Sequence, residues 1–231
     1  MTQAMTNPLR TLWQQGRCAA NGWLAVPSVL SAEVMARAGW DSLTIDLQHG
    51  MADYEAMTAM LAVIGQTETV PLVRVPWNDP TYIMRALDAG ALGIICPMIE
   101  TVADAQAFVD ACLYPPEGGR SFGPIRARLI HGDGYGAEAN RLVLPIAMIE
   151  TRAAVENLDA IAAVEGLAGL YIGPADLSSA LGHGPGFDRR EPAILEMIHR
   201  IREAARTNGL AACLHCAAAS YAAEMAATGF D

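Results

Sequence analysis

Short apolar segments alternate with longer amphipathic or alanine-rich segments along the whole chain. The apolar segments predict buried strands over residues 22–26, 42–47, 71–75, 93–97, 144–149, 169–172 and 210–214. The segments between them predict helices over residues 32–38, 54–64, 80–89, 102–113, 152–164, 192–207 and 220–227. A chain that repeats strand and helix in this way is expected to form a parallel sheet covered by helices.

Glycines and acidic residues mark the ends of these predicted helices. A glycine closely follows five of the helical segments, where a left-handed cap is favoured: Gly39, Gly90, Gly166, Gly209 and Gly229. An acidic residue opens three of the segments, where free backbone N–H groups favour an anionic side chain: Asp53, Asp79 and Glu191. Both kinds of signal agree with the boundaries that the hydrophobic pattern predicts.

Seven strand–helix units can be counted in this way, and eight such units close into a barrel. Phe230-Asp231 resembles the lead-in to an eighth strand, as Gly39-Trp40-Asp41 leads into the second. We therefore expect residues 1–231 to form a single α/β domain, a (β/α)8 TIM barrel whose eighth unit is missing or truncated. An open doubly wound sheet is the alternative, but no glycine-rich phosphate-binding segment follows the first strand.

The connection between residues 114 and 141 is unusually long and is rich in Gly, Pro and Arg. It joins the fourth helix to the fifth strand, so part of it is expected to cross the bottom of the barrel. Long connections are commonly functional or mobile, and Arg120, Arg126 and Arg128 are candidates for binding an anion there. Contacts between subunits and a short helix are equally open interpretations of this segment.

The composition suits a large buried core, because hydrophobic residues make up 52% of the chain and charged residues only 17%. The formal charge is −10, and no cluster of Lys or Arg forms a basic stripe. Binding of nucleic acid and attachment to an anionic membrane are therefore not expected. An anionic substrate would need local positive charge from an arginine or a metal ion.

The cysteines and the apolar segments favour a cytoplasmic protein. No apolar segment has the length of a signal-peptide core or of a membrane span. The five cysteines are odd in number and lie mostly in apolar segments, which favours reduced thiols. Cys213-Leu214-His215-Cys216 spells a CxxC motif, but no second pair stands at ligand spacing, so a zinc or redox role is disfavoured.

Polar and aromatic side chains collect where the predicted strands end. In strand order they are Trp23, Asp46 with His49, Arg74, Glu150 and Asp176. Because the reactive groups of α/β barrels lie at the carboxyl ends of the strands, we expect these residues to form the active site.

Glu150 and Asp176 follow adjacent strands, so their carboxylates can converge. Two carboxylates suit a hard divalent cation such as Mg²⁺, which completes its shell with water and substrate oxygens. Without a metal the two acids would repel, and one would tend to bind a proton. Taken singly, Glu150 also fits an acid near a helix start and Asp176 a turn residue. Together with His49 and Arg74, the metal site is the stronger hypothesis.

His49 follows Asp46 by three residues, close enough for the carboxylate to orient the imidazole and favour its cationic form. Such a pair can transfer a proton near neutral pH. Arg74 has the planar fork that suits bidentate binding of a carboxylate. A structural salt bridge that closes the barrel is the alternative interpretation of Arg74.

Six motifs stand in the chain in a distinctive order: AGWDSLTIDLQH (38–49), VRVPWNDP (73–80), PMIE (97–100), YPPEGGR (114–120), MIET (148–151) and YIGPADLS (171–178). In these motifs the chain resembles the HpcH/HpaI aldolases, the class II, metal-dependent pyruvate aldolases. The resemblance extends from about residue 12 to the end of the chain. It implies reversible cleavage of a 4-hydroxy-2-oxo acid into pyruvate, or hydroxypyruvate, and an aldehyde.

The resemblance also implies roles for the residues at the strand ends. The acids that match Glu150 and Asp176 bind Mg²⁺, Mn²⁺ or Co²⁺ in this family, and the metal chelates the carboxylate and ketone oxygens of the 2-oxo acid. Arg74 would contact the ketone oxygen and stabilise the enolate. His49, paired with Asp46, would be the acid–base group.

Two further features of the pocket are implied in the same way. Trp23 would line the pocket, and backbone N–H groups of the turn Gly173, Pro174, Ala175 and Asp176 would bind the substrate carboxylate. The sequence departs from the family where Gln48 replaces a common Glu and Met148 replaces a Gln found in some members. These changes leave the expected metal ligands in place and leave the metal and donor preferences open.

In relatives the eighth helix is exchanged with a neighbouring subunit and the usual assembly is a hexamer, so the resemblance implies a homo-oligomer. A citrate-lyase-like acyl-lyase or decarboxylase using the same enolate is a second enzymatic hypothesis. A non-catalytic barrel that binds 2-oxo acids is the third. The joint presence of Asp46, His49 and Arg74 argues against the third, because binding alone needs no proton-transfer pair.

Overall fold

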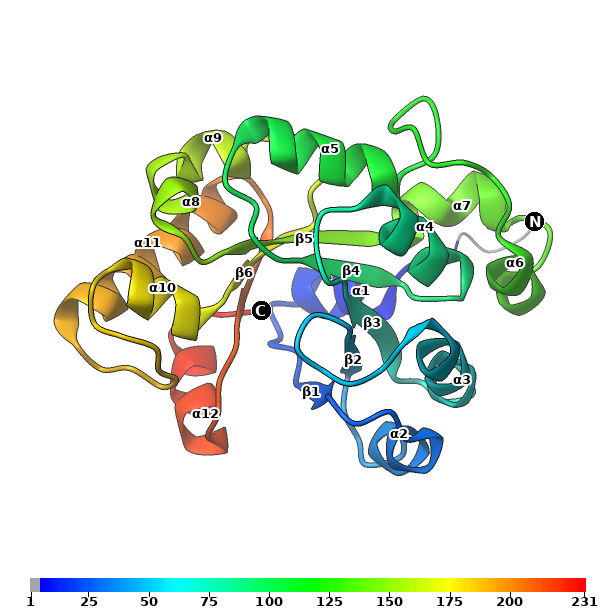
Figure 1. The fold of residues 1–231 in the computed structure, drawn as a ribbon, viewed down its shortest axis with the longest axis horizontal. Coiled ribbons are helices and arrows are strands. Elements are labelled where there is room, and N and C mark those ends of the chain that lie inside the picture. Colours follow the sequence, from blue (N-terminus) through cyan, green and yellow to red (C-terminus); the bar gives the residue numbers. More distant parts are fainter. Residues whose placement is uncertain (1–4) are drawn as a thin grey trace.

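Seven parallel strands form one curled sheet in the computed structural model, which describes residues 5–231 (Figure 1). The strands are β1 (Asn21–Leu24), β2 (Ser42–Asp46), β3 (Val70–Arg74), β4 (Gly93–Cys96), β5 (Leu144–Ile149), β6 (Gly169–Ile172) and β7 (Ala211–Leu214). They follow one another in the sheet in chain order, and every neighbouring pair is parallel. The parallel α/β fold predicted from the hydrophobic pattern is confirmed.

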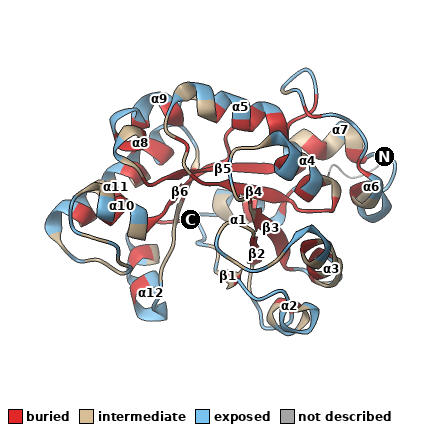
Figure 2. Ribbon diagram, in the orientation of Figure 1, coloured by how far each residue is buried: buried red, intermediate tan, exposed pale blue. Residues whose placement is uncertain are grey.

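The helices surround the curled sheet (Figure 1). Those that directly connect successive strands are α2 (Val29–Ala36), α3 (Tyr54–Ile64), α4 (Pro80–Asp88), α5 (Val102–Cys112), α8 (Arg152–Glu156), α9 (Leu158–Ala162) and α11 (Pro192–Thr207), and α12 (Ala219–Ala227) follows β7. The additional helices are α1 (Pro8–Gln14), α6 (Ile125–His131), α7 (Tyr135–Leu142) and α10 (Pro174–Ala180). Figure 2 shows the buried residues concentrated on the strands and on the helix faces that cover them.

The sheet is buried on both faces, because successive side chains of a strand point in opposite directions. In β5, Ala147 and Ile149 belong to the core between sheet and helices, whereas Ile146 and Met148 belong to a second buried cluster inside the curl. Strands buried on both faces are continuous apolar segments in the sequence, which explains why the strands could be predicted. The inner face carries the side chains from which the site is built.

The predicted helix caps are largely confirmed. The five cap glycines have φ between 69° and 104°, the left-handed region that favours glycine. Asp53 and Asp79 each accept a hydrogen bond from a backbone N–H of the helix they open, at 2.8 and 2.7 Å. Glu191 precedes α11, but its carboxylate binds the guanidinium of Arg189 at 2.8 Å instead.

The prediction of one continuous helix over residues 152–164 is wrong, since α8 and α9 are separated at Asn157. The side-chain amide of Asn157 donates to the carbonyl oxygen of Glu100 at 2.9 Å, which ties the break to the loop after β4. A side chain that bonds to distant backbone competes with the regular helix at this point.

The hydrophobic pattern does not predict α1, α6 or α7. Buried Asn7 opens α1, and its side-chain amide donates to the carbonyl oxygens of Leu92 and Leu142 at 3.2 and 2.6 Å. These bonds attach α1 to the residues that precede β4 and β5. The helices α6 and α7 lie in the long connection between residues 114 and 141, so its interpretation as a segment containing a short helix is confirmed.

Arg120 of that connection is a structural residue. Its side chain is fully buried, and its Nη2 atom lies 2.6 Å from Oδ1 of Asp88 at the end of α4. Its guanidinium carbon lies 4.4 Å from the centre of the Tyr114 ring. These contacts place the cation inside the protein, where it holds the connection against α4.

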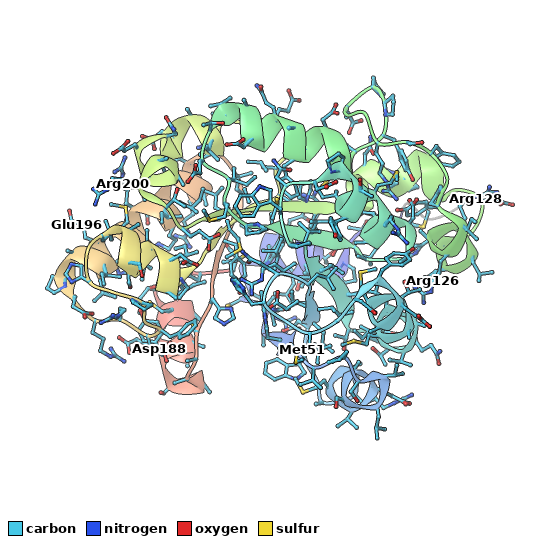
Figure 3. The ribbon with its side chains drawn as sticks, viewed as in Figure 1. Met51, Arg126, Arg128, Asp188, Glu196 and Arg200 are labelled. Carbon is cyan, nitrogen blue, oxygen red and sulfur yellow. The ribbon has the colours of Figure 1, made fainter. Side chains whose placement is uncertain are left out.

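Arg126 and Arg128 also bind groups of the protein rather than standing free for an anion. Arg126 donates to the carbonyl oxygens of Ala89 and Leu61. Arg128 pairs with Asp133 at 2.6 Å on the exposed side of α6, and Figure 3 shows both arginines at this end of the molecule. Arg120 and Arg126 therefore support the packing of α6 and of the loop before it, whereas Arg128 forms a surface ion pair.

Replacing Asp88 by alanine is expected to lower the free energy of unfolding by about 3 kcal/mol, because the buried guanidinium of Arg120 would lose its counter-ion. Urea unfolding followed by circular dichroism measures this change. Asp133→Ala is the matched control: the Asp133 side chain is 95% exposed, and removing it should leave the unfolding midpoint unchanged. An equal loss of stability in the two variants would contradict the role assigned to the buried pair.

Within residues 5–231 the sheet is open, with β1 and β7 at its two edges. The described chain thus forms a seven-stranded curled sheet, and a (β/α)8 barrel with its eighth unit missing or truncated stays a prediction. None of the helices in this range combines the length and apolar character needed to cross a membrane. Residues 1–4, which belong to the segment where no signal-peptide core is expected, lie outside the described residues.

Candidate active site

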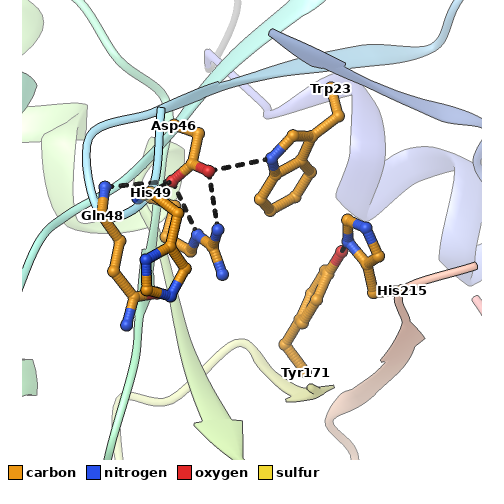
Figure 4. Close-up of polar contacts among 7 residues, drawn as sticks. Trp23, Asp46, Gln48, His49, Tyr171 and His215 are labelled. Atoms are coloured by element: carbon orange, nitrogen blue, oxygen red, sulfur yellow. Dashed lines mark hydrogen bonds and ion pairs between the residues drawn. The ribbon is translucent and has the colours of Figure 1, made fainter. Parts of the chain in front are cut away.

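Asp46, at the end of β2, is the centre of a polar cluster at the carboxyl edge of the sheet (Figure 4). Its carboxylate accepts two hydrogen bonds from Arg74 of β3, from Nε at 2.8 Å and from Nη2 at 2.6 Å. It also accepts hydrogen bonds from the indole N–H of Trp23 at 3.3 Å and from the backbone N–H groups of Gln48 and His49 at 3.0 and 3.3 Å. The strand register pairs Asp46 directly with Arg74, so the formation of the sheet itself brings acid and guanidinium together.

The prediction that Asp46 orients the imidazole of His49 is wrong in its geometry. Among the described residues, the side-chain partners of the Asp46 carboxylate are Arg74 and Trp23, and His49 contributes only its backbone N–H. The physical reason is position: Arg74 lies opposite Asp46 in the ladder, whereas His49 lies beyond the strand end with an exposed side chain. Burial alone would raise the pKa of Asp46, but the hydrogen bonds and charge of Arg74 outweigh it and lower the pKa. Asp46 therefore stays ionised.

The sequence left open whether Arg74 forms a structural salt bridge or binds a ligand, and its geometry is compatible with both. Its Nε and Nη2 atoms bind Asp46, and its guanidinium carbon lies 4.9 Å from the centre of the Trp23 ring. Its Nη1 atom has no hydrogen-bond partner within residues 5–231. The salt bridge thus fixes one edge of the guanidinium and leaves the other edge available to a ligand.

Glu150, directly after β5, is the buried acid of the site and is only 2% exposed. Its Oε1 atom accepts a hydrogen bond from the backbone N–H of Met98 at 2.9 Å. Its Oε2 atom lies over Gly173 at the end of β6, where a Cβ atom would overlap with it. Burial raises the pKa of Glu150 to about 7; the Met98 N–H opposes this shift and the charge of Asp176 adds to it.

Glu150 and Asp176 fit the requirements of a divalent cation. Asp176 is an exposed residue in the first turn of α10, and its charge acts on the buried carboxyl group of Glu150. No group of three or more His, Cys, Asp or Glu side chains able to hold a metal occurs among residues 5–231. A cation such as Mg²⁺ commonly binds through one or two carboxylates and takes its other ligands from water and substrate. A cation here would also favour the charged form of Glu150, which burial opposes.

The turn after β6 presents backbone N–H groups beside these acids. The N–H groups of Ala175 and Asp176 have no hydrogen-bond partner in the described part of the chain. Pro174 has no N–H, so it cannot take the donor role expected for all four turn residues. The donors that this turn can provide are therefore those of Gly173, Ala175 and Asp176.

Tyr171 and His215 form a second polar pair, which the sequence patterns do not predict (Figure 4). The Tyr171 hydroxyl oxygen lies 3.0 Å from Nδ1 of His215. The His215 ring stands edge-on to Trp23 with ring centres 4.7 Å apart, and the ring of Phe187 lies 5.5 Å away. The sequence held one indication of this pair. Side chains alternate between the two faces of a sheet, and counting along β6 and β7 places both Tyr171 and His215 on the inner face.

A cavity of about 670 Å³ lies inside the curl, and Trp23, Tyr171 and His215 are among its lining residues. Residues of β1, β7 and α12 also border it, so it follows the open side of the sheet. Its volume is in the range of pockets that bind small molecules. Trp23, which donates a hydrogen bond to Asp46, and the Tyr171–His215 pair therefore border a space large enough for a ligand.

A parallel sheet with three acids, a fixed arginine and two imidazoles at its carboxyl edge is typical of an α/β-barrel enzyme that stabilises a developing anion. The family model for "HpcH/HpaI aldolase/citrate lyase" matches residues 22–230, and the chain belongs to this family.

Individual relatives agree with this assignment. A hydroxypyruvate/pyruvate aldolase of Rhizorhabdus wittichii is 44% identical over 97% of this chain and 90% of its own length. A 4-hydroxy-2-oxovalerate aldolase of Rhodococcus jostii is 39% identical over 90% of this chain and 82% of its own length. A crystal structure of a HpcH/HpaI aldolase/citrate lyase family protein from Burkholderia cenocepacia superposes with a TM-score of 0.90 at 31% identity, over 97% of this chain and 90% of that one. The chain is a carbon–carbon lyase of this family.

Proposed function

We propose that the protein is a metal-dependent aldolase that reversibly cleaves a 4-hydroxy-2-oxo acid into pyruvate, or hydroxypyruvate, and an aldehyde. The observation that carries the proposal is the position of Arg74, which Asp46 fixes at the same sheet edge as Glu150 and Asp176. Relatives named as aldolases of hydroxypyruvate, pyruvate and 4-hydroxy-2-oxovalerate support this substrate class.

The proposal assigns the electrophilic half of the site to Glu150, Asp176 and Arg74. Mg²⁺, Mn²⁺ or Co²⁺ held by the two acids would bind the carboxylate and ketone oxygens of the substrate and stabilise negative charge on the ketone. The free Nη1 edge of Arg74 donates a hydrogen bond to the same ketone oxygen. The backbone N–H groups of Ala175 and Asp176 bind the substrate carboxylate.

We assign proton transfer with the C4 hydroxyl of the substrate to His49, whose exposed side chain follows β2 at the carboxyl edge of the sheet. When the C3–C4 bond breaks, this hydroxyl gives its proton to His49 and becomes the aldehyde. The electrons of the broken bond form the enolate, which then takes a proton at C3 to give the 2-oxo acid. Asp46 acts by holding Arg74, and Trp23 forms the wall of the pocket beside it.

Metal binding is expected to weaken about tenfold between pH 8 and pH 6. Burial raises the pKa of Glu150 in the metal-free protein to about 7. Below this pH the carboxyl group holds a proton that it must release to bind a metal, so affinity rises with pH up to about 7 and then levels off. Isothermal titration with Mn²⁺ across this range measures the effect.

His49→Ala is the control for this pH dependence, because it removes the exposed imidazole to which proton transfer is assigned and leaves Glu150 in place. The same profile in this variant would assign the released proton to Glu150. A Mn²⁺ affinity that does not change between pH 6 and pH 8 would contradict the assignment.

Incubation with pyruvate in D₂O tests the enolisation on which the proposal rests. We expect NMR to show deuterium entering the pyruvate methyl group in the presence of Mg²⁺, Mn²⁺ or Co²⁺. Excess EDTA should stop the exchange and added Mn²⁺ should restore it. The assay needs no knowledge of the aldehyde, and it separates an enolising aldolase from a protein that only binds 2-oxo acids.

Two results would count against the proposal in different ways. Full exchange in excess EDTA would exclude the metal mechanism. No exchange with any of the three metals would exclude pyruvate as the nucleophilic partner and would favour the citrate-lyase-like hypothesis.

We further propose that residues 1–231 belong to one (β/α)8-barrel domain. Before β2, Asp41 donates its N–H to the carbonyl of Ala20 at 3.0 Å, and its Oδ2 accepts the Ala20 N–H at 2.8 Å. Asp231 makes the same two contacts with Ala212 of β7, at 2.9 and 3.0 Å. This repetition supports a strand beside β7.

A cytoplasmic location and assembly into a homo-hexamer remain predictions.

A further inference from the structure

The ladder of β5, β6 and β7 aligns Glu150, Gly173 and His215 at the carboxyl edge of the sheet. The residues that precede them are paired across the ladder, Ile149 with Ile172 and Ile172 with Leu214. The backbone N–H of His215 also donates to the carbonyl oxygen of Ile172 at 3.3 Å. Gly173 has no side chain, and the Glu150 carboxylate and the Met148 methyl group lie over it. The register therefore brings His215 to the same level of the sheet edge as Glu150, with the turn that begins at Gly173 between them.

Tyr171 fixes the protonation of the His215 ring. The Tyr171 hydroxyl has one hydrogen-bond partner within residues 5–231, which is Nδ1 of His215 at 3.0 Å. Burial raises the pKa of Tyr171 well above its ordinary value, so the phenol keeps its proton and donates it. Nδ1 must then be the acceptor, and in the neutral ring the proton lies on Nε2. Burial, with the charge of Arg74, lowers the pKa of His215 and keeps the ring neutral.

The surroundings of His215 also fix the ring in space. Trp23 packs against it edge-on at 4.7 Å between ring centres, and Phe187 lies 5.5 Å away. In the described part of the chain, Nε2 has no hydrogen-bond partner. The pair thus presents one neutral N–H donor on an otherwise aromatic wall.

We propose that His215 determines the donor specificity of the enzyme, with its Nε2–H binding the C3 hydroxyl of hydroxypyruvate, so that hydroxypyruvate is preferred to pyruvate as the 2-oxo acid. This inference rests on the aldolase function proposed above. Pyruvate carries a methyl group at C3, which gains no polar contact and leaves the Nε2–H without a partner. A site built around a hydrogen-bond donor rejects the analogue that lacks the matching hydroxyl.

The test compares the rates of deuterium entry at C3 of hydroxypyruvate and of pyruvate, with Mn²⁺ present and no aldehyde. His215→Leu is expected to lower the ratio of kcat/KM for hydroxypyruvate to kcat/KM for pyruvate by about 10- to 100-fold. His215→Gln keeps an N–H donor in the side chain and should recover part of the ratio. Tyr171→Phe should lower the ratio by a smaller factor, because the ring proton is then no longer confined to Nε2.

His183→Leu is the matched control, because His183 is an exposed histidine in the loop after α10 and its loss should leave the ratio unchanged. Mn²⁺ binding and the thermal midpoint of each variant show whether it is folded and binds metal. An unchanged ratio in folded His215→Leu, or an equal fall for both donors, would overturn the specificity role. Absence of exchange with both donors in the unaltered protein would instead overturn the proposed aldolase function.

Discussion

Replacing Glu150 by glutamine is expected to abolish metal binding and to lower kcat/KM for aldol cleavage by about 1000-fold. The amide oxygen can still accept the Met98 N–H that Glu150 accepts at 2.9 Å, but it has no charge with which to bind a cation. Metal analysis after dialysis against Mn²⁺, together with steady-state kinetics, checks both parts. Asp176→Asn is expected to act in the same direction, because it removes the other carboxylate.

Glu156→Gln is the control for this prediction, since Glu156 is an exposed acid in α8 and the chemical change is the same. Retention of bound Mn²⁺ by Glu150→Gln would refute the assignment of Glu150 as a ligand.

The loss of activity in Glu150→Gln should not result from unfolding of the variant. Because the folded protein raises the pKa of Glu150 to about 7, charging this acid costs stability as pH rises towards 7. At pH 8 the metal-free glutamine variant should be more stable than the unaltered protein by about 3 kcal/mol.

Replacing Arg74 by alanine is expected to leave metal binding intact and to lower kcat by about 1000-fold. The substitution removes the cation that would face the ketone oxygen, while Glu150 and Asp176 remain. Arg74→Lys keeps the charge but not the fork that binds both oxygens of Asp46, so its kcat should fall between those of the unaltered protein and Arg74→Ala. Steady-state kinetics and metal analysis on the same preparations measure the two effects.

A double variant separates catalysis from structure in this prediction. Arg74→Ala leaves Asp46, which is 2% exposed, buried without its counter-ion and should also destabilise the fold. Combining it with Asp46→Asn removes the unpaired charge, so stability should partly return while kcat stays low. Recovery of kcat in the double variant would show that Arg74 matters only as the partner of Asp46.

The hydrophobic pattern was sufficient to predict the sheet because strands buried on both faces leave a strong signal. It failed where a helix depends on a distant contact. α1 opens at buried Asn7, whose amide binds the carbonyl oxygens of Leu92 and Leu142, far away in sequence. The break between α8 and α9 likewise depends on the bond from Asn157 to Glu100. Local periodicity carries no information about such partners.

The prediction of the site was limited in the same way, by contacts between residues that are distant in sequence. The strand ends identified Asp46, Arg74, Glu150 and Asp176, because parallel strands bring their carboxyl ends to one edge. The partner of Asp46 was misassigned to His49, since spacing along the chain does not reveal which side chain lies opposite in the next strand. His215 lies inside a CxxC motif, and its contact with Tyr171 could not be predicted from that motif.

The hydrogen bonds that converge on Asp46 have a consequence for how this protein can evolve. A free arginine side chain would lose roughly 2 kcal/mol of rotamer entropy on binding a ligand, whereas Arg74 is immobilised by Asp46 when the sheet forms. Recognition then requires little rearrangement, but the fold must hold a desolvated ion pair that apolar residues of similar volume could replace without loss of stability. Selection for thermal stability alone would tend to remove this pair, and selection for turnover would retain it.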